Sequence, residues 1–123
     1  MTANPFVILY VEDNDFVRES FAELLATADR RVECVADGAG AREALRKQNV
    51  NLLITDINLP DGSGLDVARE ALRQNPMLPV IVCSGQDLRG VAVALGPTVH
   101  ALMKPFEPDE LEALVGRLVQ SAT

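Results

Sequence analysis

Short apolar segments alternate along this chain with segments whose apolar residues recur at helical spacing. The strand-like segments are residues 6–11, 31–35, 52–54, 79–83 and 99–103. The helix-like segments are residues 14–28, 39–48, 65–74, 88–95 and a last segment that begins near Pro108. Short strands that alternate with helices predict a parallel sheet with right-handed crossovers and helices on both of its faces.

The number of strand–helix units narrows the fold further. Five units are too few for an eight-stranded barrel. The pattern therefore predicts an α/β, flavodoxin-like (βα)5 three-layer sandwich, with a five-stranded parallel sheet in the order 2-1-3-4-5. A chain of 123 residues has the length of one compact domain, so we expect a single domain over residues 1–123, with no separate output domain.

Helical spacing also predicts which side chains face the core. The first helix places one apolar face at Val17, Phe21, Leu24, Leu25 and Ala28. Asn14 or Asp15 is expected to cap this helix at its N-terminus. The last helix is expected to bury Leu111, Leu114, Val115 and Leu118.

Composition excludes several classes of partner. Eleven basic and 18 acidic residues give a net charge of −7, which disfavours direct binding of nucleic acid. No apolar run approaches the roughly 18 residues of a membrane span, and the N-terminus lacks a signal-peptide pattern. Cys34 and Cys83 are expected to be small buried hydrophobes in a reduced compartment. We therefore expect a soluble, cytoplasmic protein.

Polar side chains follow four of the predicted strands. Glu12 and Asp13 follow the first strand, Asp56 the third, Ser84 the fourth and Lys104 the fifth. In the predicted strand order these four strands are consecutive neighbours, and their carboxyl ends meet at one edge of the sheet. The sequence therefore predicts that three carboxylates, a hydroxyl and an ammonium converge on one crevice.

Carboxylates this close repel one another, so at least one pKa should rise unless a cation joins them. Oxygen ligands in small number suit Mg²⁺, which also accepts phosphate oxygens. Glu12, Asp13 and Asp56 contribute −3, Lys104 contributes +1 and Mg²⁺ contributes +2, so the total charge is zero. A neutral site of this kind can admit an anionic phosphoryl group.

Four motifs at these strand ends resemble a known family. They are Val11-Glu12-Asp13-Asn14, Asp56-Ile57-Asn58-Leu59-Pro60 with Gly62 and Gly64-Leu65, Ser84-Gly85, and Lys104-Pro105-Phe106. In this order they resemble the signature of two-component response-regulator receiver domains, over essentially the whole chain. The resemblance is to a single-domain regulator or to the receiver of a hybrid kinase.

The resemblance implies a phosphorelay chemistry. Asp56 would accept a phosphoryl group from a phosphohistidine on a histidine kinase or a histidine phosphotransfer domain. Ser84 and Lys104 would contact the phosphoryl oxygens, and the Lys104–Pro105 bond would be cis. The chain would catalyse only its own phosphorylation and dephosphorylation, and would not be an enzyme with a separate substrate. It would signal through contacts with a downstream protein or act as a relay or sink.

The resemblance also implies a set of ligands for Mg²⁺. Asp13 and Asp56 would bind the ion directly, and Glu12 directly or through water. The backbone carbonyl of Asn58 would complete the set of protein ligands.

The chain departs from the family between its fourth strand and its lysine. Ala101 stands where the family usually has a switch aromatic, and His100 points to the other face of the sheet. Gly90 and Gly96 leave the fourth helix short. We therefore expect phosphorylation either to rearrange the loop after Ser84 and this helix, or to need no large change because the domain is a relay or sink.

Three alternatives remain open. An unphosphorylated pseudo-receiver would only dock partners. A haloacid-dehalogenase-like phosphatase would need Asp at the position of Asn58 and its motif after the first strand. A flavin-binding protein would need a phosphate-cradling first loop, which is acidic here. His100 is interpreted as a strand or surface residue, and Arg42, Arg46 and Lys47 as a solvated helix face.

Overall fold

The structure is a computed structural model that describes residues 5–121. Five parallel strands form one sheet in the order β2-β1-β3-β6-β7. Their bounds are β1 Phe6–Val11, β2 Arg30–Val35, β3 Leu52–Asp56, β6 Val80–Ser84 and β7 Val99–Met103. Counting only these five strands, the order is the predicted 2-1-3-4-5, and the flavodoxin-like prediction is confirmed.

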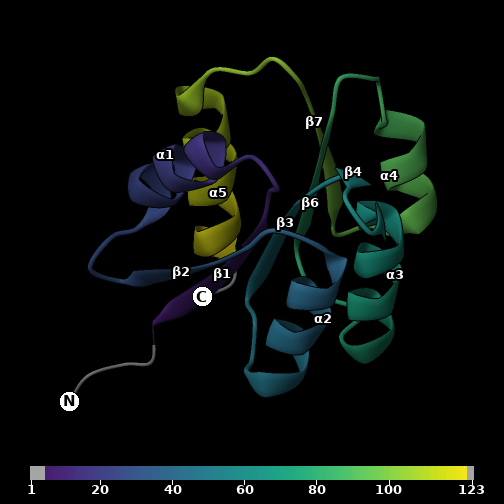
Figure 1. The fold of residues 1–123 in the computed structure, drawn as a ribbon, viewed down its shortest axis with the longest axis horizontal. Coiled ribbons are helices and arrows are strands. Elements are labelled where there is room, and N and C mark those ends of the chain that lie inside the picture. The colour runs from purple at the N-terminus through teal and green to yellow at the C-terminus, as the bar shows by residue number, and fades with distance from the viewer. Residues whose placement is uncertain (1–4, 122–123) are drawn as a thin grey trace.

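Five helices cover the two faces of this sheet. They are α1 Asp15–Leu25, α2 Gly38–Lys47, α3 Gly64–Gln74, α4 Arg89–Leu95 and α5 Pro108–Ser121. Figure 1 shows α1 and α5 together on one side of the sheet and α2, α3 and α4 on the other. The structure is therefore the three-layer sandwich that the alternating pattern predicts.

The central strands are apolar on both faces because each face packs against helices. In β1, Leu9 and Val11 belong to the core cluster under α2, α3 and α4. Ile8 and Tyr10 belong to the cluster under α1 and α5. The edge strand β2 is only partly buried, which agrees with its alternating sequence.

The first helix is shorter than predicted. It is capped by Asn14, whose side chain accepts a hydrogen bond from the Val17 amide (3.0 Å). It ends at Leu25 because Ala26 is extended (φ −71°, ψ 130°) and the chain then turns into β2. Ala28 therefore lies outside the helix and is exposed, and Leu24 is 38% exposed, so both residues were wrongly assigned to the core face.

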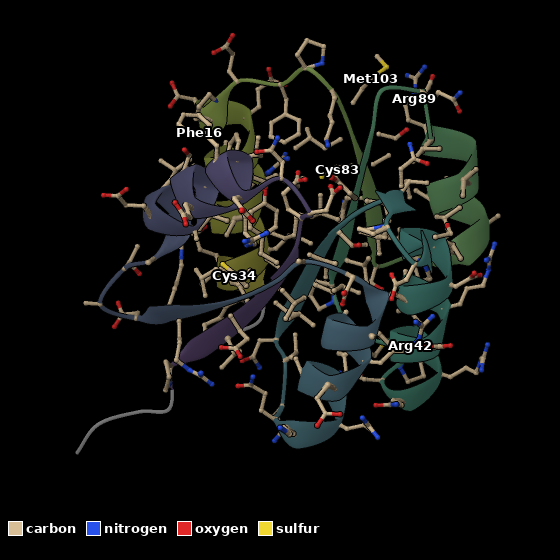
Figure 2. All side chains as sticks on the ribbon, in the orientation of Figure 1. Phe16, Cys34, Arg42, Cys83, Arg89 and Met103 are labelled. Carbon is tan, nitrogen blue, oxygen red and sulfur yellow. The ribbon has the colours of Figure 1, made fainter. Side chains whose placement is uncertain are left out.

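The last helix and the cysteines differ in smaller ways from expectation. Leu118 is half-buried, whereas the other three predicted residues of its face are buried. Cys83 is buried in the sheet, as Figure 2 shows, but Cys34 is only half-buried because it lies on the edge strand β2. Both thiols are free.

Among residues 5–121, no helix is long and apolar enough to span a membrane.

A short hairpin that the sequence did not predict follows β3. The strands β4 (Asn58–Leu59) and β5 (Gly62–Ser63) pair antiparallel, and Gly62 has a φ of 148° at the turn. A φ in this range favours glycine, which explains the residue at this position. The hairpin leads directly from β3 into α3.

Candidate functional site

The carboxyl ends of the strands gather the predicted acidic residues. One carboxylate oxygen each from Glu12, Asp13 and Asp56 lies within 4.8 Å of the others. The Lys104 ammonium lies 2.6 Å from Oδ1 of Asp56 and 3.6 Å from Oε1 of Glu12. The structure thus brings together the three carboxylates and the lysine that the strand ends predict.

Ser84 lies at the same edge, but its hydroxyl has a local partner. It accepts a hydrogen bond from the Gln86 amide (3.1 Å). The Ser84 carbonyl accepts one from the Lys104 amide (2.7 Å), which joins the ends of β6 and β7. Ser84 is therefore placed at the rim of the site, next to the lysine along the sheet edge.

Burial differs among the three carboxylates. Glu12 is 3% exposed and Asp56 is 7% exposed, whereas Asp13 is open to solvent. Oε2 of Glu12 accepts a hydrogen bond from the Asn14 amide (3.1 Å), which fixes this side chain beneath the loop that starts α1. The cluster is therefore buried at Glu12 and Asp56 and exposed to solvent at Asp13.

The charges in the cluster shift one another's titration. Burial and the neighbouring Asp56 raise the pKa of Glu12, against smaller opposing effects of the Asn14 amide and Lys104. Burial by itself would lower the pKa of Lys104, but the hydrogen bond and charge of Asp56 outweigh it, and the pKa is raised. The lysine is thus held charged beside the carboxylates. The raised pKa of Glu12 agrees with the prediction that at least one carboxylate pKa rises when no cation joins the cluster.

Gly64 makes the closest approach to the backbone of Asp56. A Cβ at position 64 would lie 1.8 Å from the Asp56 carbonyl oxygen and 2.8 Å from Oγ1 of Thr55. The Gly64 amide also donates to the carbonyl of Ile57 (2.8 Å). The start of α3 therefore packs directly against the end of β3, which only glycine permits.

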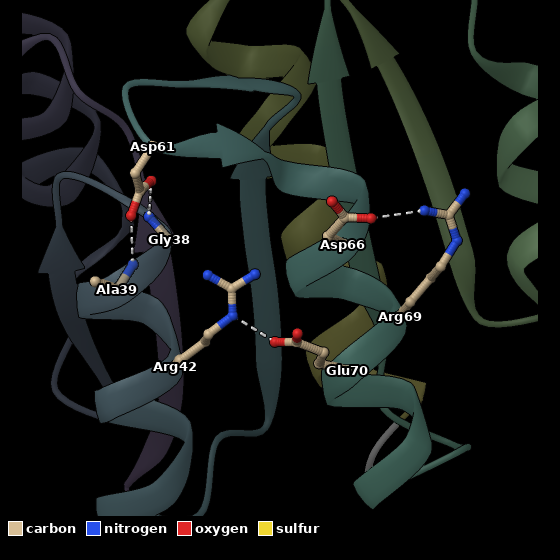
Figure 3. A network of polar contacts seen from close by, with 7 residues as sticks. All are labelled: Gly38, Ala39, Arg42, Asp61, Asp66, Arg69 and Glu70. Atoms are coloured by element: carbon tan, nitrogen blue, oxygen red, sulfur yellow. Dashed lines mark hydrogen bonds and ion pairs between the residues drawn. The ribbon is translucent and has the colours of Figure 1, made fainter.

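Asp61 in the hairpin turn contacts a different helix. Its Oδ1 accepts from the Gly38 amide (2.8 Å) and its Oδ2 from the Ala39 amide (2.9 Å), as Figure 3 shows. These two bonds lower the pKa of Asp61. Sequence reasoning missed this residue because its partners lie more than 20 positions away.

The loop after Lys104 carries the predicted cis bond. The Lys104–Pro105 peptide is cis, the isomer that the resemblance implied. Phe106 then packs on Phe21, with ring centroids 5.5 Å apart, and Phe21 packs edge-on against Tyr10 at 6.5 Å. These aromatic rings line a cavity of about 480 Å³ beside Glu12 and Asp56, which sequence reasoning did not identify.

The residues of the predicted switch position lie on β7. Ala101 and its neighbour His100 are both half-buried. Both line a cavity of about 530 Å³ between α4 and α5. Burial and the charge of Arg117 lower the pKa of His100. His100 is therefore the half-buried strand residue that was expected, and it lies outside the acidic cluster.

The basic residues of α2 are bound to carboxylates. The Arg42 guanidinium donates to Glu70 on α3 (2.5 Å), and Arg46 and Lys47 both pair with Glu43. Arg46 and Lys47 are exposed, as predicted for a solvated face, whereas Arg42 is half-buried and bridges α2 to α3 (Figure 3).

Together, the fold and these contacts define a flavodoxin-like α/β domain with an acidic, lysine-paired site at the carboxyl ends of its strands. Comparison with known proteins agrees with this class. The family model of the response regulator receiver domain matches residues 8–116. The chain belongs to this family and is a receiver domain of the two-component response-regulator type.

Two relatives in Pseudomonas aeruginosa are similar over most of this chain. The transcriptional regulatory protein GltR is 33% identical over an alignment of 127 positions, which covers 99% of this chain and 52% of GltR. The response regulator protein PmrA is 36% identical over 119 residues, which cover 94% of this chain and 53% of PmrA. The chain thus spans about half the length of these relatives.

Solved structures show the same fold. A response regulator receiver protein from Sinorhizobium medicae superposes with a TM-score of 0.85 at 28% identity, covering 97% of this chain and 98% of the other. The chemotaxis response regulator CheY4 of Vibrio cholerae gives 0.82 at 25% identity, covering 94% and 99%.

Proposed function

We propose that Asp56 accepts a phosphoryl group from a phosphohistidine in a reaction that depends on Mg²⁺. A carboxylate oxygen of Asp56 attacks phosphorus, the new P–O bond forms, and the P–N bond to the imidazole breaks. The leaving imidazole nitrogen keeps the electron pair of that bond. The observation that carries this proposal is the packing of three carboxylate oxygens within 4.8 Å of one another, with Lys104 Nζ 2.6 Å from Asp56.

The donor set fits a small divalent cation. Glu12, Asp13 and Asp56 supply hard oxygen ligands in one cluster, and the Asn58 carbonyl would add a fourth from the loop after β3. A bound Mg²⁺ would offset the negative charge of the carboxylates, so that an anionic phosphoryl group is not repelled. Without a cation, burial and the neighbouring Asp56 raise the pKa of Glu12.

Two further side chains serve the phosphoryl group. Lys104 turns its ammonium from the Asp56 carboxylate to a phosphoryl oxygen and pairs with it as a point charge. Ser84 donates its hydroxyl to a second oxygen. Its position at the end of β6, where its carbonyl accepts a hydrogen bond from the Lys104 amide, supports this role. Most of the rate enhancement in such a transfer comes from positioning and charge neutralisation.

The partners follow from this chemistry. The donor is a histidine kinase or a histidine phosphotransfer domain in the cytoplasm, and the phosphorylated domain acts on a downstream protein or passes the phosphoryl group on. With a net charge of −7, this domain itself does not bind nucleic acid. The alternative of a pseudo-receiver is less favoured, because Asp56, the other two carboxylates and Lys104 lie together. No separate substrate is turned over.

Incubation with acetyl phosphate and Mg²⁺, followed by intact-mass measurement, tests the proposal. The expected result is the addition of one phosphoryl group that hydroxylamine removes. The Asp56→Asn variant should gain no mass, whereas Asp66→Asn, which changes an exposed carboxylate on α3, should gain as much as the wild type. Addition of the same mass to Asp56→Asn would overturn the assignment, and no addition to the wild type would favour the pseudo-receiver.

A further inference from the structure

Two carboxylates cap the N-terminus of α2, and only one of them belongs to that helix's own chain segment. Asp37 is the local cap, and its Oδ1 accepts from the Gly40 amide (2.7 Å). Asp61 comes from the β4–β5 hairpin and accepts from the Gly38 and Ala39 amides (2.8 and 2.9 Å). The first three amides of the helix, which have no partner within a helix, are thereby all satisfied.

The contact between the hairpin and α2 depends on close approach. A Cβ at Gly38 would lie 3.2 Å from Oδ1 of Asp61 and 2.9 Å from Nη1 of Arg42. Gly62, with φ 148°, turns the chain directly after Asp61. Gly38 and Gly62 therefore both favour this contact. Figure 3 shows the Asp61 carboxylate facing the Gly38 and Ala39 amides.

The hairpin is held at two places. Its base is fixed to α3, because the Gly64 amide donates to the Ile57 carbonyl and Ser63 Oγ accepts from the Leu65 amide. Its turn is fixed to α2 by Asp61. Asn58 lies between these two anchors, two residues after Asp56.

We infer that Asp61 is a positioning residue for the cation site, because it ties the hairpin turn to α2 and so holds the Asn58 carbonyl in place beside Asp56. The inference rests on the proposed function, in which that carbonyl is a ligand. A ligand on a short two-residue strand is poorly placed unless the surrounding contacts fix it. Asp61 touches neither the cation nor the phosphoryl group, and it acts through the backbone of the hairpin.

The structure offers a matched control. Asp37 and Asp61 are both carboxylates that cap α2, so loss of either removes one negative charge and helix-capping hydrogen bonds. Only Asp61 connects the helix to the hairpin. Asp37→Ala and Asp61→Ala should therefore both lower thermal stability, whereas only Asp61→Ala should change the binding of Mg²⁺.

The test is a Mg²⁺ titration of the full chain at constant ionic strength, in which the backbone amide NMR signals report binding. Asp61→Ala should bind Mg²⁺ about tenfold more weakly than the wild type, a loss typical for residues that support metal ligands. Asp61→Asn keeps one accepting oxygen and should show a smaller loss, and it supports the same comparison if the alanine variant does not fold. Asp37→Ala should bind within about twofold of the wild type.

A second readout uses the reciprocity of coupled equilibria. If the hairpin links the cation site to α2, bound Mg²⁺ must slow hydrogen exchange of the Gly38 and Ala39 amides in the wild type, and this protection must vanish in Asp61→Ala. Equal Mg²⁺ affinity in Asp61→Ala and wild type, or equal weakening in Asp37→Ala, would overturn the inference alone. A wild-type chain that binds no Mg²⁺ would overturn the proposed function together with it.

Discussion

Lys104 and Asp56 form the shortest contact of the candidate site, with Nζ 2.6 Å from Oδ1. The Asp56 side chain is 9% exposed and that of Lys104 is 39% exposed, so the pair spans the boundary between the buried base of the cluster and solvent. The ammonium thus neutralises part of the acidic charge in the metal-free domain. It also occupies an oxygen of the proposed phosphoryl acceptor.

The Lys104→Met substitution should therefore strengthen Mg²⁺ binding and slow phosphorylation. Without the competing ammonium, Mg²⁺ affinity should rise about fivefold, since two unit charges about 4 Å apart interact by about 1 kcal/mol under water-like screening. Phosphorylation by acetyl phosphate should become about a hundredfold slower, as for loss of one group that stabilises developing charge. A Mg²⁺ titration and a time course of intact mass measure the two effects. A fall in both properties together would mean that Lys104 only maintains the shape of the site.

Gly64→Ala should destabilise the fold severely. The new Cβ would lie 1.8 Å from the Asp56 carbonyl oxygen, which is backbone and already accepts from Thr55 Oγ1 (2.9 Å), so neither group can move cheaply. We expect a loss of about 3 kcal/mol in the free energy of unfolding, at the upper end for overpacking of a core. Urea denaturation measures this loss.

Gly90→Ala is the matched control for this substitution. Gly90 lies in α4 with open space around the position of a Cβ. The change should leave stability unaltered or raise it by up to about 1 kcal/mol, because alanine favours a helix. Similar losses in both variants would show that glycine matters at position 64 for a reason other than its contact with the Asp56 carbonyl at the end of β3.

The sheet and most of the site could be predicted because they follow from strand order and strand ends. Glu12, Asp13, Asp56 and Lys104 lie together simply because they terminate neighbouring parallel strands. The long apolar run of β1 is likewise explained by helices on both faces. Strand order and strand ends follow from the alternation of apolar and helical segments along many residues. The conformation of a single loop or helix end does not change them.

The remaining features depend on contacts that no short pattern contains. Asp61 meets Gly38 across 23 positions, and both residues look like ordinary turn formers in the sequence. The strands β4 and β5 have two residues each, which is too short for an alternation of polar and apolar residues to indicate a strand. Ala28 fits the helical spacing of α1, but the backbone leaves the helix at Ala26, and spacing alone could not indicate this end.

Glu12→Gln should stabilise the metal-free domain while weakening its cation site. Burial and Asp56 raise the pKa of Glu12, so its ionised form is less favourable in the folded state than in the unfolded state. At pH 7 the neutral amide should raise the free energy of unfolding by about 1 kcal/mol. This is the usual gain when a substitution removes an unfavourable charge from a functional site. Mg²⁺ affinity should fall, because one oxygen ligand loses its charge.

The pH dependence of this difference has a definite sign. An acid whose folded pKa is raised contributes stability at low pH, and this contribution is lost as pH rises through the raised value. The advantage of Glu12→Gln should therefore be absent below the ordinary glutamate value of 4.5 and grow above it. Urea denaturation of both chains with chelator, between pH 4 and 8, measures the difference. An advantage that is constant with pH would exclude titration of Glu12 as its cause.

The helix α4 should be the first part of the domain to open and the part that responds to phosphorylation. It has seven residues, its N-cap Leu88 makes no side-chain capping bond, and Ala92 is its one buried residue. By contrast, α3 buries Val67, Ala68 and Ala71 and is capped by a serine. Amides of α4 should exchange with deuterium at least about tenfold faster than those of α3. Treatment with acetyl phosphate and Mg²⁺ should then change exchange within residues 84–97. Unchanged exchange there, in a chain shown by mass to be phosphorylated, would favour a relay or sink that works without any rearrangement of α4.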